Sequence, residues 1–579
     1  MDANFFDSIV YEFIVNTFMV SNYLIFLFSY FLIVLSVVGH GLLAIKLTKT
    51  NVSIDEIGFV GLVGIFFLIL YSYITHFFIS HGYIHNIIFI TVGLVSIYYF
   101  RSKLLTKKNL ILLFSIFLII FLAFVIFKTH DDFGYYHFPY SYYLNKFSMI
   151  IGIGPLNHGF RTPSSIFYLN SLFYLPYLEY YLYHMGAILV LGFSNIILIS
   201  NIKNYLDKKE NNQFFFLNLL AFIFINIFFY RIAEHGTDRS AQILIFLFFI
   251  YILSLRGSYQ NFDNILPKLI VLLSIIISLK SFYILYFIFI LPFIYYIVKD
   301  NKFNLIYKIF KNPILYFSVL MGICVILVYF FNTGCLLYPV QQTCISGIEW
   351  GIPSSEVSAL NTHYQWWSKA GGGPGYSHEL EKELYIQNFN WLSNWIDRYF
   401  FNKMSDFLLG LSFISILLIT IFKSKNKVVK NKNFTMNLFY YCLIILLLAE
   451  WFFNHPSLRY GGYVIFALIF FIPLSYLLSK YEMSKNFRLK SMIIFFLVSA
   501  IFVGRNVDRI IYELNFYQAN FKQNMFFFTD KKHFRIDNKL KNISKIYNNC
   551  KPNINNCSNN QDFIIKKAYG KMILIRIKN

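Results

Sequence analysis

Charged side chains are scarce in this sequence of 579 residues, and acidic ones are the scarcest. Charged residues make up 13% of the chain, hydrophobic residues make up 57%, and the mean hydropathy is +0.56. So little charge excludes a soluble globular protein, and many apolar runs are long enough to cross about 30 Å of hydrocarbon. The sequence therefore predicts an all-α, polytopic membrane protein.

The shortage of acidic residues leaves an excess of basic ones, but their placement does not indicate a nucleic-acid partner. The chain has 50 Lys and Arg against 28 Asp and Glu, a formal net charge of +22. Most of the basic residues fall in short loops between hydrophobic runs, which is the pattern of the positive-inside rule. We therefore expect a lipid bilayer, and no nucleic acid, as the partner that this charge reflects.

A basic N-terminal region is also missing. Asp2, Asp7 and Glu12 precede the first hydrophobic run, so we expect that run to remain as a membrane span instead of being cleaved as a signal peptide. No nucleotide-phosphate loop and no solenoid repeat is visible in the sequence.

Hydropathy predicts about fourteen transmembrane helices. They cover residues 22–45, 55–79, 84–100, 109–127, 180–200, 213–231, 240–255, 264–279, 282–298, 313–331, 405–422, 434–453, 461–479 and 489–504. With the N-terminus outside, every second loop is rich in Lys and Arg, and the positive-inside rule assigns these loops to the cytoplasm. The weakest point is the pair 264–279 and 282–298, because only Lys280 and Ser281 separate them. If this pair were a single bent span, every later loop would lie on the opposite side of the membrane.

The opposite set of loops is poorer in Lys and contains every candidate motif. These loops are 128–162, 234–239, 332–404 and 454–462. The sequence thus predicts three regions: N-terminal transmembrane helices at 1–108, a main transmembrane region at 109–504, and a small C-terminal α/β tail domain at 505–579. The tail ends in a predicted hairpin around Tyr569 and Gly570.

The first candidate motif follows the fourth predicted span. His130, Asp131, Asp132 and His137 place four titratable groups within eight residues at a membrane boundary. Adjacent carboxylates can hold a divalent cation such as Mg²⁺ or Mn²⁺, which neutralises a phosphate leaving group, or one of them can act as a general base. The alternative is a solvated helix cap. We take Asp132 and Asp131 as the candidate catalytic and metal-binding residues, and His130 and His137 as substrate-binding residues.

Arginines in three of these loops are candidates for contacts with phosphate, because a guanidinium offers a fixed fork of donors. Arg161 follows Asn157 and His158, and snorkelling at the interface is its alternative role. Asp238 and Arg239 lie in a compact connection with Glu234 and His235, where a turn that only satisfies the backbone is the alternative. His455 and Arg459 lie between two later spans, where headgroup anchoring is the alternative.

The segment from Thr162 to about Leu178 is apolar and aromatic but is interrupted by Pro163, Pro176 and several polar residues. Such a segment fits a helix that lies in the interface, or a re-entrant one that lines a cavity, better than a full span. We expect it to form the floor or wall of a site built on the acidic motif.

Tryptophan and cysteine are rare, so their clustering is informative. The chain has 6 Trp and 6 Cys. Five of the tryptophans fall in the loop 332–404, where carbohydrate stacking or interfacial anchoring explains them equally well. The pairs Cys335/Cys344 and Cys550/Cys557 are predicted as disulfides, because both lie on the outer side of the predicted topology.

The motifs resemble those of a known class of enzymes. An acidic pair on an outer loop, an interfacial segment and many further spans resemble the GT-C class of integral-membrane glycosyltransferases. More closely, residues 132–137, 154–167, 334–339 and 456–461 look like an uncharacterised family of bacterial multi-pass proteins. In GT-C enzymes the acidic motif follows the first span, whereas here it follows the fourth. The difference indicates an addition of three N-terminal helices, or it limits the analogy.

The resemblance implies hexosyl or pentosyl transfer from a polyprenyl-phosphate-linked sugar to a glycan or lipid-linked acceptor. The expected location is the bacterial inner membrane, with the active face in the periplasm, in a pathway that makes cell-surface glycans. Two other functions stay open at this point. One is a surface-polysaccharide polymerase or ligase, and the other is a lipid-linked-sugar transporter or flippase.

Overall fold

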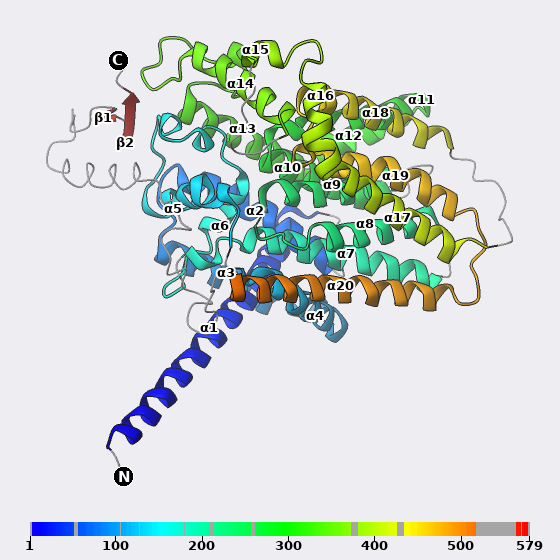
Figure 1. The fold of residues 1–579 in the computed structure, drawn as a ribbon, viewed down its shortest axis with the longest axis horizontal. Helices are drawn as coiled ribbons and strands as arrows, with labels where there is room; N and C mark the ends of the chain where they lie inside the picture. Colours follow the sequence, from blue (N-terminus) through cyan, green and yellow to red (C-terminus); the bar gives the residue numbers. More distant parts are fainter. Residues whose placement is uncertain are drawn as a thin grey trace.

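All fourteen segments predicted as spans are helical in the computed structural model (Figure 1). The structure describes residues 3–50, 56–104, 106–126, 128–178, 180–208, 212–234, 236–255, 261–371, 380–424, 434–516, 563–568 and 570–576. Within these ranges, 11 helices are long and apolar enough to cross a membrane, and three apolar helices are shorter: Gln213–Phe228, Leu438–Asn454 and Gly462–Leu478. The all-α, multi-pass fold class is confirmed, while the number of helices that meet the length criterion is eleven.

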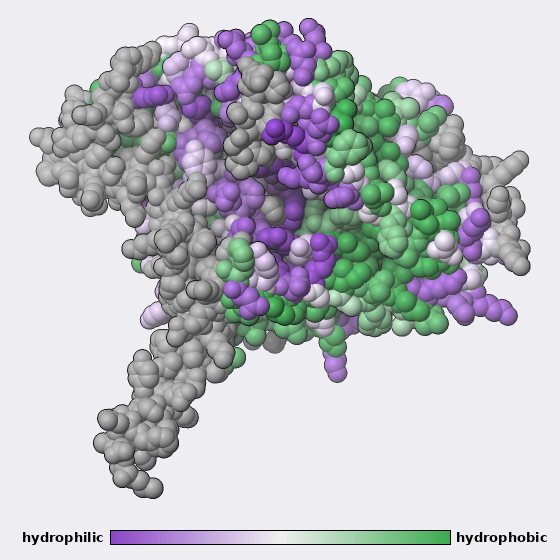
Figure 2. Space-filling view, viewed as in Figure 1, coloured by the Kyte–Doolittle hydropathy of each residue, from purple (hydrophilic) through white to green (hydrophobic). Residues whose placement is uncertain are grey.

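The membrane-spanning bundle is built from long apolar helices and the segments that join them. In chain order these are α1 (Ala3–Thr48), α2 (Ile57–His76), α3 (Tyr83–Leu104), α4 (Lys107–Phe124), α7 (Met185–Lys208), α8 (Gln213–Phe228), α9 (Gly236–Ser254), α10 (Phe262–Leu279), η6 (Ser281–Phe289) with α11 (Ile290–Lys299), α13 (Pro313–Thr333), α17 (Ser405–Phe422), α18 (Phe434–Asn454), α19 (Gly462–Leu478) and α20 (Phe487–Phe516). Figure 2 shows apolar side chains over α17 and α19, with hydrophilic side chains at both ends of these helices. An apolar belt between two polar ends is what a bilayer requires.

The uncertain pair around Lys280 is a hairpin and not one bent span. Lys280 is extended, with φ −150° and ψ 119°, and ends α10. The ring of Phe262, at the start of α10, stacks on Phe293 in α11 with centroids 5.6 Å apart. Beyond α11, Lys308 of the short α12 (Asn304–Lys311) lies 2.7 Å from Asp263. The chain therefore returns to the end of the bundle from which α10 began, and the predicted alternation of loops continues through this pair.

The loops rich in Lys meet at one end of the bundle. Lys268 pairs with Glu56, which precedes α2. Gln213, at the start of α8, donates to Ser475 near the end of α19 at 3.3 Å. Lys490 in α20 donates to the carbonyl of Ile421, near the end of α17, at 2.6 Å. We call the opposite end, where residues 128–162, 332–404 and 454–461 lie, the site face.

The segment 162–178 is a wall element and not a span, as predicted. Ser164 caps α6 (Ser165–Ser171), whose seven residues are all buried. Ser72 in α2 donates to the carbonyl of Tyr168 at 2.7 Å. Of the two placements predicted for this segment, the buried cavity wall is the one observed, because its polar side chains and backbone are satisfied by neighbouring helices and not by an interface.

Four helices also lie in the long loop 332–404 on the site face. They are α14 (Ser354–Lys369), α15 (Lys382–Tyr385), α16 (Leu392–Trp395) and the π-helix η8 (Ile396–Met404), which continues into α17. The predicted disulfide Cys335–Cys344 is present and closes a loop before α14. The second predicted pair, Cys550 and Cys557, lies outside the described residues.

The predicted hairpin at the end of the chain is present and packs on the site face. Strands β1 (Phe563–Ala568) and β2 (Lys571–Arg576) are antiparallel. The backbone of Ile151 donates to the Met572 carbonyl at 2.9 Å and accepts from Leu574 at 2.8 Å, so β2 gains a second neighbour. The tail boundary predicted at 505 falls inside α20, which continues to Phe516.

Candidate functional site

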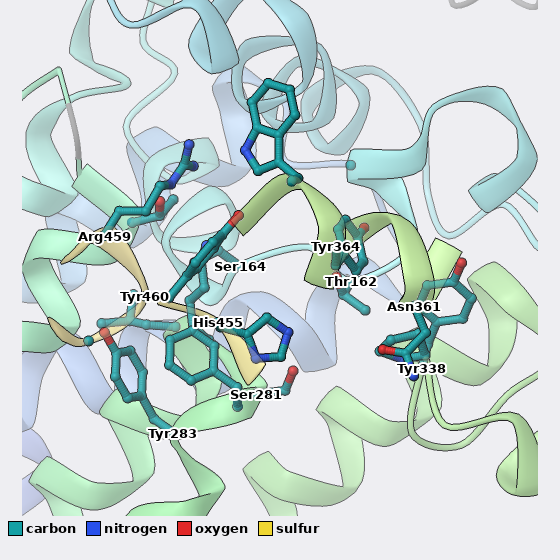
Figure 3. A pocket seen from close by; sticks show the side chains of 18 of the residues that line it. Thr162, Ser164, Ser281, Tyr283, Tyr338, Asn361, Tyr364, His455, Arg459 and Tyr460 are labelled. Carbon is teal, nitrogen blue, oxygen red and sulfur yellow. The ribbon is translucent and has the colours of Figure 1, made fainter. Parts of the chain in front are cut away.

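A cavity of about 930 Å³ lies at the site face, between the ends of the membrane helices and the extramembrane segments (Figure 3). Its lining comes from the acidic motif, α6, the break between α10 and η6, the loop before α14, α14 itself, and the connection between α18 and α19. A cavity of this size is typical of a small-molecule or cofactor site. Segments separated by hundreds of residues in the sequence thus line one space.

Four charged side chains form a chain of ion pairs at this cavity, which we call the charged tetrad: Asp132, Arg459, Asp238 and Lys280. Arg459 Nη2 donates to Asp132 Oδ2 at 2.9 Å. Arg459 Nε lies 3.4 Å from Asp238 Oδ2, and Lys280 Nζ lies 2.5 Å from Asp238 Oδ1. Asp132, Lys280 and Arg459 line the cavity, while Asp238 is buried behind them. The predicted convergence of Asp132, Asp238 and Arg459 is therefore observed.

Local backbone features position two members of the tetrad. Asp238 lies in the first turn of α9, where a negative charge is favoured by the helix dipole. Arg459 lies in the 3-10 turn Leu458–Tyr460, and this turn ends at Gly461, whose φ is +91°. A left-handed residue suits glycine and lets α19 start immediately after the turn.

Two tryptophans hold the connection that contains Arg459. The indole of Trp395 donates to the Pro456 carbonyl at 2.7 Å, and the indole of Trp451 donates to the Ser457 carbonyl at 2.9 Å. Both tryptophans are buried. A buried carbonyl needs such a partner, so these contacts fix the loop in which the arginine lies.

The two adjacent aspartates have different surroundings. Burial alone would raise the pKa of Asp132, but the guanidinium of Arg459, with smaller contributions from His137 and His130, lowers it to about 2. Asp131 lines the same cavity, is exposed, and forms no ion pair with the residues that the structure describes. Asp132 is thus a fixed partner of Arg459, whereas the Asp131 carboxylate is free to meet a ligand.

The predicted metal role of the two aspartates does not have a complete set of protein ligands. Within the described ranges no group of three or more His, Cys, Asp and Glu side chains is arranged to hold a metal ion. Mg²⁺ is commonly held by one or two carboxylates together with substrate phosphates. A cation at Asp131 would therefore take its other ligands from substrate and water.

The three predicted histidines are near the tetrad in different roles. His130 Nδ1 accepts from the Asp132 backbone N–H at 3.1 Å. His137 is buried, and burial lowers its pKa to about 3 even though Asp132 opposes this shift. His455 lines the cavity, and burial lowers its pKa to about 4. His137 and His455 are therefore neutral near pH 7.

Two predicted substrate-binding arginines do not line the cavity. Arg161 is buried and is bound by Glu356, whose Oε1 lies 2.5 Å from Nη2, and by the Tyr338 hydroxyl at 2.8 Å. Arg239 donates to the Arg231 carbonyl at 3.3 Å and lies over the Phe229 ring. Both arginines thus have protein groups as neighbours, and neither is placed to meet a ligand in the cavity. His235, in the same predicted motif, lies outside the described residues.

Several lining residues were not predicted as members of the site. Lys280 had a visible signal, since it is the one charge between two apolar runs. Glu450 and Tyr460 had weaker signals, as they lie near predicted span ends. The cavity is also lined by residues of α14, which had no signal beyond the tryptophan: Ser358, Asn361, His363, Tyr364 and Trp367.

Comparison with known families assigns most of the chain to one of them. Residues 23–466 match the family described as Domain of unknown function (DUF8201), and the chain belongs to this family. The match begins at residue 23 and so includes the predicted N-terminal helices. No curated protein and no solved structure matches the chain.

Proposed function

We propose that this member of the DUF8201 family is a glycosyltransferase that uses a polyprenyl-phosphate-linked sugar at the cavity of the site face. The observation that supports the proposal best is the charged tetrad beside a free carboxylate, at the boundary between membrane helices and extramembrane segments. In this proposal the membrane is the bacterial inner membrane, the site face is periplasmic, and the product enters a cell-surface glycan.

The two ends of the cavity suit the two ends of such a donor. On the membrane side the lining is mainly apolar and comes from Leu279, Phe282, Leu285, Leu447 and Ile465. Leu285 is 41% exposed, so this part of the apolar lining is not covered by protein. A polyprenyl chain would lie there, with its phosphate at Lys280 and Arg459.

Charge balance supports a phosphate that arrives with a cation. Six Asp, Glu, Lys and Arg side chains line the cavity or complete the tetrad: Asp131, Asp132, Asp238, Glu450, Lys280 and Arg459. At their ordinary charges they sum to −2 (four acids, two bases). A divalent cation such as Mg²⁺ or Mn²⁺ would offset this charge and the developing charge of the leaving phosphate.

The roles of the two aspartates follow from their surroundings. The Asp132 carboxylate anchors Arg459 and, with a pKa of about 2, is a poor proton acceptor. Asp131 is therefore assigned as the general base or cation ligand. The acceptor hydroxyl oxygen bonds to the sugar C1, its proton passes to Asp131, and the bond from C1 to the phosphate oxygen breaks to release polyprenyl phosphate.

The test is turnover by the purified full-length protein in lipid vesicles with polyprenyl-phosphate sugars and added Mg²⁺ or Mn²⁺. We expect Asp131→Asn to lower turnover by about 10²–10⁴-fold, the usual contribution of a general base. Glu349→Gln, a change of an exposed carboxylate outside the cavity, should leave it unchanged.

Full activity of the double variant Asp131→Asn/Asp132→Asn would overturn the transferase proposal. Movement of the lipid-linked sugar across the vesicle membrane without a new glycosidic bond would instead indicate the transporter. Retained turnover in Asp131→Asn with loss in Arg459→Gln would favour the polymerase or ligase, which relies on arginine.

A further inference from the structure

The extramembrane half of the cavity differs in chemistry from its membrane half. We call the side chains that line it beneath α14 the roof subsite: Tyr338, Gln341, Ser358, Asn361, Tyr364 and Trp367. Figure 3 shows Tyr338, Asn361 and Tyr364 together on one side of the cavity, apart from Arg459, Tyr460 and Tyr283. The roof subsite thus combines aromatic faces with hydroxyl and amide groups and contains no formal charge.

The row of α14 residues in the roof subsite follows the helix geometry. Ser358, Asn361, Tyr364 and Trp367 are spaced by three residues, so that neighbours in this row lie next to one another along one ridge of the helix. Asn361 is exposed to the cavity, and its amide forms no hydrogen bond with the residues that the structure describes. An aromatic surface beside the Asn361 amide is therefore available to a ligand.

The arginine behind the roof subsite is paired with a carboxylate. Arg161, behind Tyr338, is bound by Glu356, and Glu356 Oε2 also lies 3.0 Å from Arg576. Burial lowers the pKa of His158 and of His363, which both line the cavity, so both are neutral near pH 7. Among the described residues that line this half there is no Lys or Arg, which argues against an acidic sugar or a phosphate there.

The tryptophans of the long loop separate into two groups. Trp391 and Trp395 are buried, and Trp350 donates to the Phe330 carbonyl at 3.3 Å. Trp366 lies under the ammonium of Lys382, 5.0 Å from the ring centroid, and does not line the cavity. Among these five side chains only Trp367 presents itself to the cavity, so it is not explained by anchoring in an interface.

We propose that the roof subsite binds an uncharged sugar residue of the glycan acceptor, stacked on Trp367 and hydrogen-bonded by Asn361. Aromatic faces that pack on an apolar surface, together with a few placed polar groups, are the ordinary means of orienting a neutral polar ligand. The name "acceptor" rests on the proposed transferase function, but binding of the sugar does not depend on turnover. Asp132, Lys280 and Arg459 of the tetrad line the same cavity, so the acceptor hydroxyl would meet the donor within it.

The experiment measures binding by the full-length protein in detergent to neutral oligosaccharides and to uronic-acid oligosaccharides of the same length. We expect neutral members to bind and Trp367→Ala to weaken that binding by about tenfold or more. Trp366→Ala, the matched control one position away on the same helix, should change it by less than about twofold. Thermal melting of both variants, and partial recovery in Trp367→Phe, separate loss of stacking from loss of folding.

Three results would overturn the proposal: binding of no neutral oligosaccharide, preference for the acidic ones, or equal weakening by Trp366→Ala and Trp367→Ala. Competition by an excess of polyprenyl-phosphate sugar would also overturn it, because the roof would then hold the donor's own sugar. Asp131→Asn separates this proposal from the transferase function, since it should keep saccharide binding and lose turnover. Saccharide binding without any turnover in the unaltered protein would support the subsite and contradict the transferase proposal.

Discussion

Asp131 and Asp132 are neighbours in the chain, yet the tertiary contacts give them opposite tasks. Arg459, 327 positions away, binds Asp132 and keeps it ionised. A charge held in a pair has little tendency to accept a proton, whereas the free neighbour keeps this ability. Arg161 and Arg239 are poorer candidates for substrate contacts than Arg459 and Lys280, because only Arg459 and Lys280 line the cavity.

Protonation of buried histidine predicts a pH dependence of stability. His137 has an ordinary pKa of 6.5 and a pKa of about 3 in the folded protein. Between these values the unfolded chain binds more protons than the folded one, so stability falls as the pH is lowered from 6.5 toward 3. One such group contributes about 1.4 kcal/mol per pH unit. Thermal melting in detergent from pH 7.5 to 4.5 measures this slope.

His137→Phe, which keeps a ring among Phe133 and Phe167, should flatten that slope. Part of the slope will remain, because burial also lowers the pKa of His455 to about 4. At pH 7.5 histidine is neutral in both states, and the difference between variant and parent there gives the packing effect alone. A slope that His137→Phe leaves unchanged would contradict the assignment.

Among the extramembrane elements, Glu356 joins α14 to two other parts of the site face. It binds Arg161 from the loop before α6 and Arg576 from β2, so the roof helix, the cavity wall and the C-terminal hairpin share one carboxylate. Arg161 is only 8% exposed, which makes its half of this contact stronger than a surface ion pair. The position of the roof subsite thus depends on the loop before α6 and on the C-terminal hairpin.

Glu356→Gln is expected to loosen both α14 and the hairpin. Loss of one partly buried ion pair costs roughly 1–2 kcal/mol, which corresponds to about a tenfold faster amide exchange if the elements open locally. Hydrogen exchange of residues 354–369 and 571–576 measures the effect. The matched control is Glu349→Gln, whose partner Lys566 is exposed and lies on β1. If α14 exchanged no faster in Glu356→Gln than in this control, the ion pairs of Glu356 would have no role in holding α14 at the roof subsite.

At the scale of the whole molecule, the hairpin of α10 with η6 and α11 determines which loops share a side. Phe262 on Phe293 and Lys308 beside Asp263 bring residues 262 and 308 to the same end of the bundle. All segments of the site face then lie at the other end. The separation of Lys-rich loops from the cavity is a property of the entire helix order and not of any one loop.

Reporter fusions test this arrangement in cells. A fusion after residue 260 and one after residue 301 should report the same side, and a fusion within 372–379 should report the opposite side. The physical reason is that two antiparallel spans return the chain to its starting side, whereas one bent span does not. Opposite sides for 260 and 301 would contradict the hairpin, and the side on which both lie tests the positive-inside assignment.

The sequence predicted those parts of the site that depend on neighbouring residues in the chain, and it missed those that depend on residues far apart in the chain. The acidic motif, Asp238, Arg459, the first cysteine pair and the C-terminal hairpin were all visible as local patterns, and the structure contains them as predicted. Lys280 was visible but was interpreted as a topological detail. The local sequence does not show which of Asp131 and Asp132 is paired, or which of Trp366 and Trp367 lines the cavity. Adjacent side chains differ in the residues that face them in the folded protein, and the local pattern does not contain that information.

By itself the sequence determined the class of fold and the position of the helices, since apolar runs and basic loops respond to the bilayer independently of tertiary contacts. Only the tertiary structure decided the partners of the charges and the division of the cavity into two halves. Asp132, Asp238, Lys280 and Arg459 are separated by up to 327 positions. Ion pairs act over a few ångströms, so their formation is decided by how the helices pack and not by the order of residues in the chain.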